Sequence, residues 1–235
     1  ALLAALGGEA AAQILVTHDH ADHSPLARAL SEATGAPVAG LDRPSAPHIE
    51  GPTVEAGDDM AFRPDRRITG GEVFSGPGWS LRAVETPGHT ANHLAYTLAE
   101  EETLFSGDHV MAWSTSIVAP PDGSMAAYMA SIEKLRGMTH RLYRPGHGGP
   151  VTEPQRFLRG LVQHRRQREA AVLNRIGAGD ETIAAMVPAI YQGLAPALHG
   201  AAALSVLAQI EDLVARGLVA ASDAVPGLSS RYRLA

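Results

Sequence analysis

Three histidines and two aspartates lie within one short stretch, Thr17-His18-Asp19-His20-Ala21-Asp22-His23. This stretch directly follows the apolar run Ile14-Leu15-Val16, whose aliphatic and β-branched residues are typical of a buried strand. Imidazole nitrogens and carboxylate oxygens are the ligands that zinc and similar divalent ions prefer. The spacing therefore predicts a metal site in a loop at the end of a strand, with four candidate ligands: His18, His20, Asp22 and His23.

Further along the chain, three more short apolar segments end in a loop that carries a candidate ligand. The segment 80–85 precedes His89, 103–105 precedes Asp108, and 141–144 precedes His147. A glycine stands next to each of these ligands and lets the backbone turn sharply. Because ligands at the ends of neighbouring strands can converge, we expect the five histidines and two aspartates to hold two ions, with Asp108 bridging them.

Such a pair of ions predicts hydrolytic chemistry. Two ions about 3.5–4 Å apart hold a bridging water and lower its pKa toward roughly 7, so that a hydroxide can attack a carbonyl or phosphoryl centre. Asp22 could orient this nucleophile or carry a proton, which makes Asp22 and Asp108 the candidate catalytic carboxylates.

The chain contains no cysteine, which excludes disulfides, thiolate zinc sites and cysteine nucleophiles. Nitrogen and oxygen ligands favour two Zn²⁺, with Mn²⁺ and Fe²⁺ as alternatives. We expect the other six histidines to pack or to face solvent, and His109 to pack rather than to support a ligand: His48, His93, His109, His140, His164 and His199.

Charge is distributed unevenly over the 235 residues. Residues 1–153 contain 10 Lys/Arg and 19 Asp/Glu, whereas residues 154–235 contain 9 arginines and 6 Asp/Glu. We interpret this as an acidic metal-binding body followed by a different domain. No run of about 18 apolar residues predicts a membrane span, and the apolar start lacks the basic segment of a signal peptide. We expect a cytoplasmic protein that acts on a small molecule or RNA, with homo-oligomerisation left open.

The elements around the ligands alternate between strand and helix. We expect helices over 25–33 and 125–136, a short strand over 37–40, a strand over 93–98, and an irregular segment over 41–79 with a short strand near 72–74. Beyond Pro154 we expect helices over 157–176, 181–191 with Asp180 as N-cap, and about 201–216. Segments 218–220 and 230–234 could then pair as a hairpin, which completes the outline of a winged helix. The predicted domains are therefore 1–153 and 154–235.

Taken together, four motifs resemble those of the metallo-beta-lactamase superfamily: T-H-D-H-A-D-H at 17–23, T-P-G-H-T at 86–90, S-G-D at 106–108 and P-G-H-G at 145–148. The resemblance implies an α/β fold, a four-layer αββα sandwich with a dinuclear site at one edge. It implies one ion on His18, His20 and His89, and the other on Asp22, His23 and His147, with Asp108 bridging.

Members of this superfamily have several strands before the first motif, but only 17 residues precede His18 here. We therefore expect the N-terminal strands to be missing and one sheet edge to be exposed. Ser24-Pro25 replaces the two glycines of many members, which should change the loop shape but not the ligands.

A further motif, His164-Arg165-x-x-Arg168-Glu169, resembles the branch of this superfamily with a C-terminal winged-helix-like domain. That branch includes an endoribonuclease and hydroxyacylglutathione hydrolase-like members. Arg165 and Glu169 are four residues apart and could pair on a helix. We favour arginines that clamp this helix against the acidic body over arginines that bind substrate. The weak candidates for substrate contact are Trp113, Ser114, Arg165 and Arg168, and Trp113 could equally belong to the core.

The residues favour a hydrolase with a dinuclear metal site that acts on a small-molecule ester or thioester. One alternative is an RNA phosphodiester hydrolase, which a groove lined by Arg165, Arg166 and Arg168 would favour. Aromatic residues make up only 5% of the chain and the body is acidic, which argues against extensive contact with nucleic acid. The other alternative is a regulatory or nucleic-acid-binding protein with structural metals, although structural sites usually lack open positions. A true lactamase ranks last.

Overall fold

The computed structural model describes residues 2–43, 57 and 59–235. His48 and part of the irregular segment 41–79 lie outside these residues. A five-stranded sheet runs in the order β4-β5-β6-β7-β8, and all neighbours are antiparallel except β7 and β8. Its strands are β4 (Val73–Gly76), β5 (Trp79–Glu85), β6 (Leu94–Leu98), β7 (Thr103–Gly107) and β8 (Leu142–Pro145). A smaller parallel sheet has the order β1-β2-β3, with strands β1 (Ile14–Leu15), β2 (Val38–Gly40) and β3 (Arg66–Arg67).

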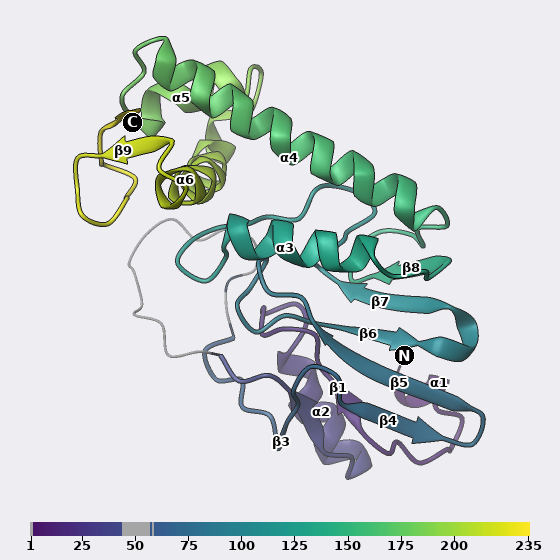
Figure 1. Cartoon of the computed structure of the whole chain (residues 1–235). Helices are drawn as coiled ribbons and strands as arrows, with labels where there is room; N and C mark the ends of the chain where they lie inside the picture. Colours follow the sequence, from purple (N-terminus) through teal and green to yellow (C-terminus); the bar gives the residue numbers. More distant parts are fainter. Residues whose placement is uncertain (1, 44–56, 58) are drawn as a thin grey trace.

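Helices cover the outer faces of both sheets, so that the body has four layers (Figure 1). Helix α2 (Pro25–Thr34) packs on the smaller sheet through Ala27. Helices α3 (Met125–Arg136) and α4 (Pro154–Gly177) cover the larger sheet. The remaining short helices here are α1 (Leu2–Ala5) and η1 (Ala99–Glu101). The arrangement confirms the predicted αββα sandwich, and in the described sheet β1 lies at an edge.

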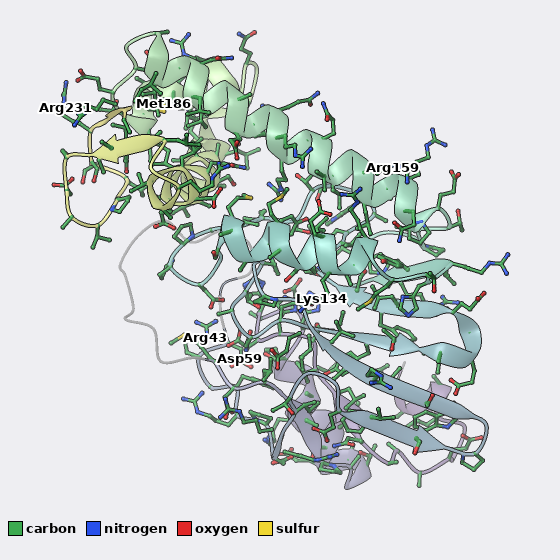
Figure 2. The ribbon with its side chains drawn as sticks, viewed as in Figure 1. Arg43, Asp59, Lys134, Arg159, Met186 and Arg231 are labelled. Carbon is green, nitrogen blue, oxygen red and sulfur yellow. The ribbon has the colours of Figure 1, made fainter. Side chains whose placement is uncertain are left out.

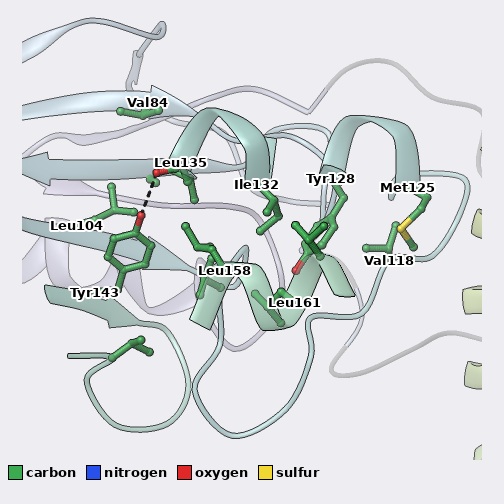
Figure 3. Packing of buried hydrophobic residues seen from close by; sticks show 14 of the residues in the cluster. Val84, Leu104, Val118, Met125, Tyr128, Ile132, Leu135, Tyr143, Leu158 and Leu161 are labelled. Atoms are coloured by element: carbon green, nitrogen blue, oxygen red, sulfur yellow. Dashed lines mark hydrogen bonds between the residues drawn. The ribbon is translucent and has the colours of Figure 1, made fainter. Parts of the chain in front are cut away.

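Alternating side chains of the larger sheet enter two different cores. Ala83 packs between the two sheets, while its neighbour Val84 packs under the helices. Leu94 and Ala95 divide in the same way because successive side chains on a strand point to opposite faces. Figure 3 shows the helix-side core, in which the hydroxyl of Tyr143 donates to the carbonyl of Leu135 at 3.4 Å.

The C-terminal lobe has the predicted helices and hairpin. Helices α5 (Ile183–Ile190) and α6 (His199–Ala215), with η2 (Pro196–Leu198) between them, are followed by the antiparallel pair β9 (Val219–Ala221) and β10 (Tyr232–Leu234). Helix α4 serves both cores, because Leu158 lies in the core of the body whereas Val172 and Ile176 lie in the core of the lobe. The division into domains 1–153 and 154–235 stays a prediction.

Several local predictions need correction. The N-cap of α5 is Thr182, whose side chain accepts from the backbone N–H of Ala185, and Asp180 instead accepts from Nε of Arg175 at 2.6 Å. The pairing that the spacing of Arg165 and Glu169 would allow is not formed: Glu169 binds Arg216 at 2.6 Å, and Arg165 donates to the carbonyl of Ser116. The span Pro196–Ala215 is long and apolar enough to cross a membrane by length and composition, although no uninterrupted apolar run predicts it. Several of its apolar side chains, such as Ile210, lie in the core of the lobe, whereas Leu198 is 51% exposed.

Candidate metal centre

All seven predicted ligands meet at one edge of the sandwich. The loop after β1 carries His18, His20, Asp22 and His23 before α2 begins at Pro25. His89 follows β5, Asp108 follows β7, and His147 follows β8. These three strands run in the same direction, so their carboxyl ends lie at a common edge. The strand order thus explains how ligands far apart in the sequence converge.

The first group of ligand atoms consists of three histidine nitrogens. Nδ1 of His20 lies 3.2 Å from Nε2 of His18 and 3.1 Å from Nε2 of His89. Nδ1 of His89 donates to the carbonyl of Ile117 at 2.6 Å, provided that this nitrogen carries the ring proton. The Nε2 lone pair of His89 then faces the other two rings. Such a set of facing lone pairs suits a cation.

The second group lies beside the first and is more open to solvent. Oδ2 of Asp22 lies 2.9 Å from Nε2 of His147 and 3.5 Å from Nε2 of His23. The two Nε2 atoms of His23 and His147 are 3.2 Å apart. The side chain of Asp22 is 38% exposed, whereas that of His18 is fully buried, so the second group faces the opening of the site.

Asp108 lies between the two groups. Its Oδ2 is 3.2 Å from Nε2 of His23 and 3.4 Å from Nε2 of His147. The same oxygen is 3.9 Å from Nε2 of His89 and 4.0 Å from Nε2 of His18. Its Oδ1 is buried and has no hydrogen-bond partner among the described residues. An unpaired buried carboxylate oxygen is costly, and a cation would offset that cost. The residues therefore fit divalent metal binding.

The protonation states of these groups also suit metal binding. Burial, with a smaller contribution from His20, lowers the pKa of His89 to about 4. Burial, assisted by His93 and other neighbouring imidazoles, lowers the pKa of His18 well below its usual value. Burial alone would raise the pKa of Asp108, but the hydrogen bond and charge of His23 bring it below the ordinary value. Neutral imidazoles and an ionised carboxylate are the forms that bind metal.

Two of the motif glycines are required because other groups approach them closely. A Cβ at Gly146 would lie 2.3 Å from Oδ1 of Asp108, and a Cβ at Gly88 would lie 2.3 Å from Cα of Tyr128. Gly88 also has a φ of 136°, which L-residues rarely adopt. These glycines allow the loops of His89 and His147 to reach the site.

Two supporting residues were not predicted from the sequence. His93 was expected to be structural, yet its Nε2 accepts the backbone N–H of Asp108 at 3.1 Å. Its Nδ1 therefore carries the ring proton and donates to Oγ1 of Thr86 at 2.8 Å. Asp19 is buried and accepts two hydrogen bonds from Arg43, at 2.7 and 3.1 Å. The only sequence signal was proximity to the ligand motifs.

The weaker candidates lie in different environments. Trp113 is 71% exposed, and its ring stacks on that of His147 at a centroid distance of 5.5 Å. Ser114 is also exposed. Arg165 is buried and donates to the carbonyl of Ser116, whereas Arg168 donates to the carbonyl of Ile190 at 3.1 Å.

His109 packs as predicted. Its ring lies 4.6 Å from that of Tyr128, and neither ring nitrogen has a hydrogen-bond partner in the part of the chain that the structure describes. Its ring therefore makes no hydrogen bond to a candidate ligand among the described residues.

Comparison with known proteins agrees with this geometry. The sequence profile described as metallo-beta-lactamase superfamily matches residues 3–147, and that of the beta-lactamase associated winged helix domain matches residues 182–227. The chain is 32% identical over 164 residues to the atrochrysone carboxyl ACP thioesterase of Aspergillus fumigatus, which covers 68% of this chain and 45% of that protein. It is 30% identical over 214 residues to the beta-lactamase-like protein 2 homolog of Drosophila melanogaster, which covers 87% of this chain and 68% of that protein.

A solved structure has the same fold along nearly the whole chain. The beta-lactamase domain protein from Burkholderia ambifaria superposes with a TM-score of 0.80 at 22% identity, over 97% of this chain and 75% of that one. The chain spans less than half the length of the fungal thioesterase. The profile match and the insect relative show that the chain belongs to the metallo-beta-lactamase superfamily and carries its associated winged helix domain.

Proposed function

We propose that the chain is a metal-dependent hydrolase with two divalent ions, which acts on an ester or thioester of a small molecule. One observation carries the proposal: two sets of three candidate ligand atoms lie around Oδ2 of Asp108, whose Oδ1 is buried with no hydrogen-bond partner among the described residues. A purely structural metal site usually has all of its coordination positions filled by the protein, whereas one side of this site is open to solvent. The exposure of Asp22 on that side leaves room for a reactant.

The residues take distinct roles in this proposal. His18, His20 and His89 would hold one ion, Asp22, His23 and His147 would hold the other, and Asp108 would contact both. When bound, the ions would supply Lewis-acid chemistry, which would lower the pKa of water at the site toward about 7. Asp22 is exposed at the opening and is suited to accept a proton there. Zn²⁺ suits the nitrogen and oxygen ligands best, and Mn²⁺ and Fe²⁺ are the alternatives.

Trp113 is the proposed contact for the substrate. Its exposed indole stacks on His147 and so offers a flat apolar surface directly beside the open group of ligands. An acyl chain or ring could lie on this surface while the scissile carbonyl reaches the site. The similarity to a protein named as a thioesterase supports thioesters as the first substrate class to test.

The arrangement of arginines gives less support to RNA. Arg165 is buried, and Arg168 binds the carbonyl of Ile190 and stacks on Tyr191, so neither lines the expected groove. Arg166 is exposed, as is Arg159, which projects from α4 in Figure 2. RNA cleavage therefore serves as an outcome of the test rather than as a second proposal.

The test is a substrate panel combined with metal analysis. A thioester, a phosphodiester, a short RNA and a chromogenic lactam are each assayed before and after chelation, and bound metal is counted by mass spectrometry. We expect turnover of the thioester that is lost on chelation and restored by Zn²⁺. Thioester hydrolysis that survives complete metal removal would refute the metal-dependent mechanism, and metal-dependent cleavage of RNA alone would refute the substrate class.

Asp108→Asn tests the bridging role directly. The amide removes the shared negative charge at nearly constant shape, so we expect fewer than two ions per chain and loss of turnover. Asp223→Asn, an exposed carboxylate in the C-terminal lobe, is the matched control. An Asp108→Asn variant that keeps two ions and the wild-type rate would disprove the bridging role.

A further inference from the structure

Arg165 is a buried arginine for which the described residues provide no carboxylate within ion-pair distance. It is only 6% exposed, and its Nη2 donates to the carbonyl of Ser116. Its Cζ lies 4.8 Å from the centroid of the Tyr128 ring, and its Nε is buried with no hydrogen-bond partner in the part of the chain that the structure describes. Desolvation of a guanidinium is costly. The contact with Ser116 is therefore the main compensation visible for this cost.

The next carbonyl along the chain orients a proposed metal ligand. The carbonyl of Ile117 accepts a hydrogen bond from Nδ1 of His89 at 2.6 Å. Oγ of Ser116 donates at 3.0 Å to the carbonyl of His109, the residue after Asp108. The segment that Arg165 holds is thus joined on one side to the loop of His89 and on the other to the loop of Asp108.

Helix α4 carries Arg165 between the two cores of the molecule. Leu158 and Leu161 lie in the core of the body, and Val172 and Ile176 lie in that of the C-terminal lobe. A hydrogen bond to the second ring nitrogen sets the tautomer and orientation of a metal-binding histidine. A contact that fixes Ile117 therefore acts on His89 without touching the metal.

We propose that Arg165 is a positioning residue through which α4 holds Ser116 and Ile117 and so keeps Nε2 of His89 directed at the metal site. This inference rests on the proposed metal-binding function. It goes further than an arginine that clamps the helix to an acidic body, because Arg165 acts through a backbone carbonyl that adjoins the one bound by His89.

The test compares Arg165→Met and Arg165→Lys with Arg166→Met, a control at the exposed neighbouring position. Affinities for Zn²⁺ and Co²⁺ are measured by competition with a chromophoric chelator, and the visible spectrum of bound Co²⁺ reports its coordination. In the metal-free chain, ¹⁵N NMR of the histidine rings reports the hydrogen bond of His89. We expect Arg165→Met to weaken binding of one ion by about tenfold, to change the Co²⁺ spectrum and to shift the Nδ1 resonance of His89. Arg165→Lys, which can still donate to a carbonyl, should show smaller changes, and the control none.

A folded Arg165→Met variant with the affinity and spectrum of the wild type would overturn the inference. Should this variant fail to fold, Arg165→Lys decides: an unchanged His89 resonance together with wild-type affinity also overturns it. A wild-type chain that binds no Zn²⁺ would instead refute the proposed function, so the two failures can be told apart.

Discussion

Gly146→Ala should damage the site by displacing a single carboxylate. The added Cβ would lie 2.3 Å from Oδ1 of Asp108 and 2.8 Å from Cε1 of His23, whereas ordinary contacts begin at 3.4 Å. Relief of the clash requires the carboxylate or the loop to shift by about 1 Å. A misplacement of about 1 Å in a reacting group costs about 100-fold in rate. We therefore expect kcat/KM for the best substrate of the panel to fall by about two orders of magnitude, with loss of one ion.

Gly149→Ala is the matched control for this experiment. Gly149 lies in the same loop, but a Cβ there meets nothing within 4 Å. Turnover, metal content and thermal unfolding are measured for both variants. Gly149→Ala should behave as the wild type, and Gly146→Ala should remain folded but be nearly inactive. A Gly146→Ala variant with two ions and the wild-type rate would show that the close approach of this loop to Asp108 is not required.

Three further predictions concern support, protonation and substrate contact. His93→Leu leaves the backbone N–H of Asp108 without its acceptor, so the free energy of unfolding measured in urea should fall by about 1–3 kcal/mol. His93→Gln should recover part of this loss. Equal stability of His93→Leu and the wild type would contradict this role of His93. Burial lowers the pKa of His89 to about 4 and that of His109 to about 3 in the folded metal-free chain. In the unfolded chain both histidines titrate near 6.5, so the unfolded state binds their protons at a higher pH than the folded state does. Each histidine should therefore remove about 2 kcal/mol of stability between pH 7 and 5. Burial raises the pKa of Glu211 to about 7, so this residue adds stability to the folded chain as pH falls from 7 to 5. Urea unfolding of Glu211→Gln should therefore show a steeper loss of unfolding free energy over this range. A gain in the stability of that variant toward pH 5 would contradict the pKa shifts assigned to the two histidines. Trp113→Ala should lower kcat/KM for an acyl thioester by about tenfold. Trp79→Ala, at the opposite end of β5 from the site, should not, and equal effects of the two would argue against a substrate contact.

The local sequence was sufficient for most of the elements. Helix α2 begins at Pro25, because proline is tolerated in a first helical turn, and it ends before Gly35, which adopts a φ of 75°. Helix α3 begins and ends at the predicted residues, Met125 and Arg136. The N-cap of α5 was misplaced because Asp180 and Thr182 are both good capping residues, and only the contact with Arg175 decides between them.

The sequence by itself determined which side chains could bind metal. The residue types of His18 to His23, and the glycines beside His89, Asp108 and His147, are local properties that need no fold to be recognised. They were enough to predict the superfamily and the candidate ligands that the structure brings together.

Tertiary structure alone decided what supports these ligands. The spacing of Arg165 and Glu169 would allow them to pair on the helix, yet packing of α4 against the body buries Arg165 beside Ser116, and Glu169 binds Arg216. His93 had no special pattern, but the pairing of β5, β6 and β7 places it under Asp108. Such contacts join residues far apart in the chain through backbone groups, which carry no sequence signature. The sequence therefore identifies the candidate ligands, whereas the fold identifies the residues that contact them and their loops.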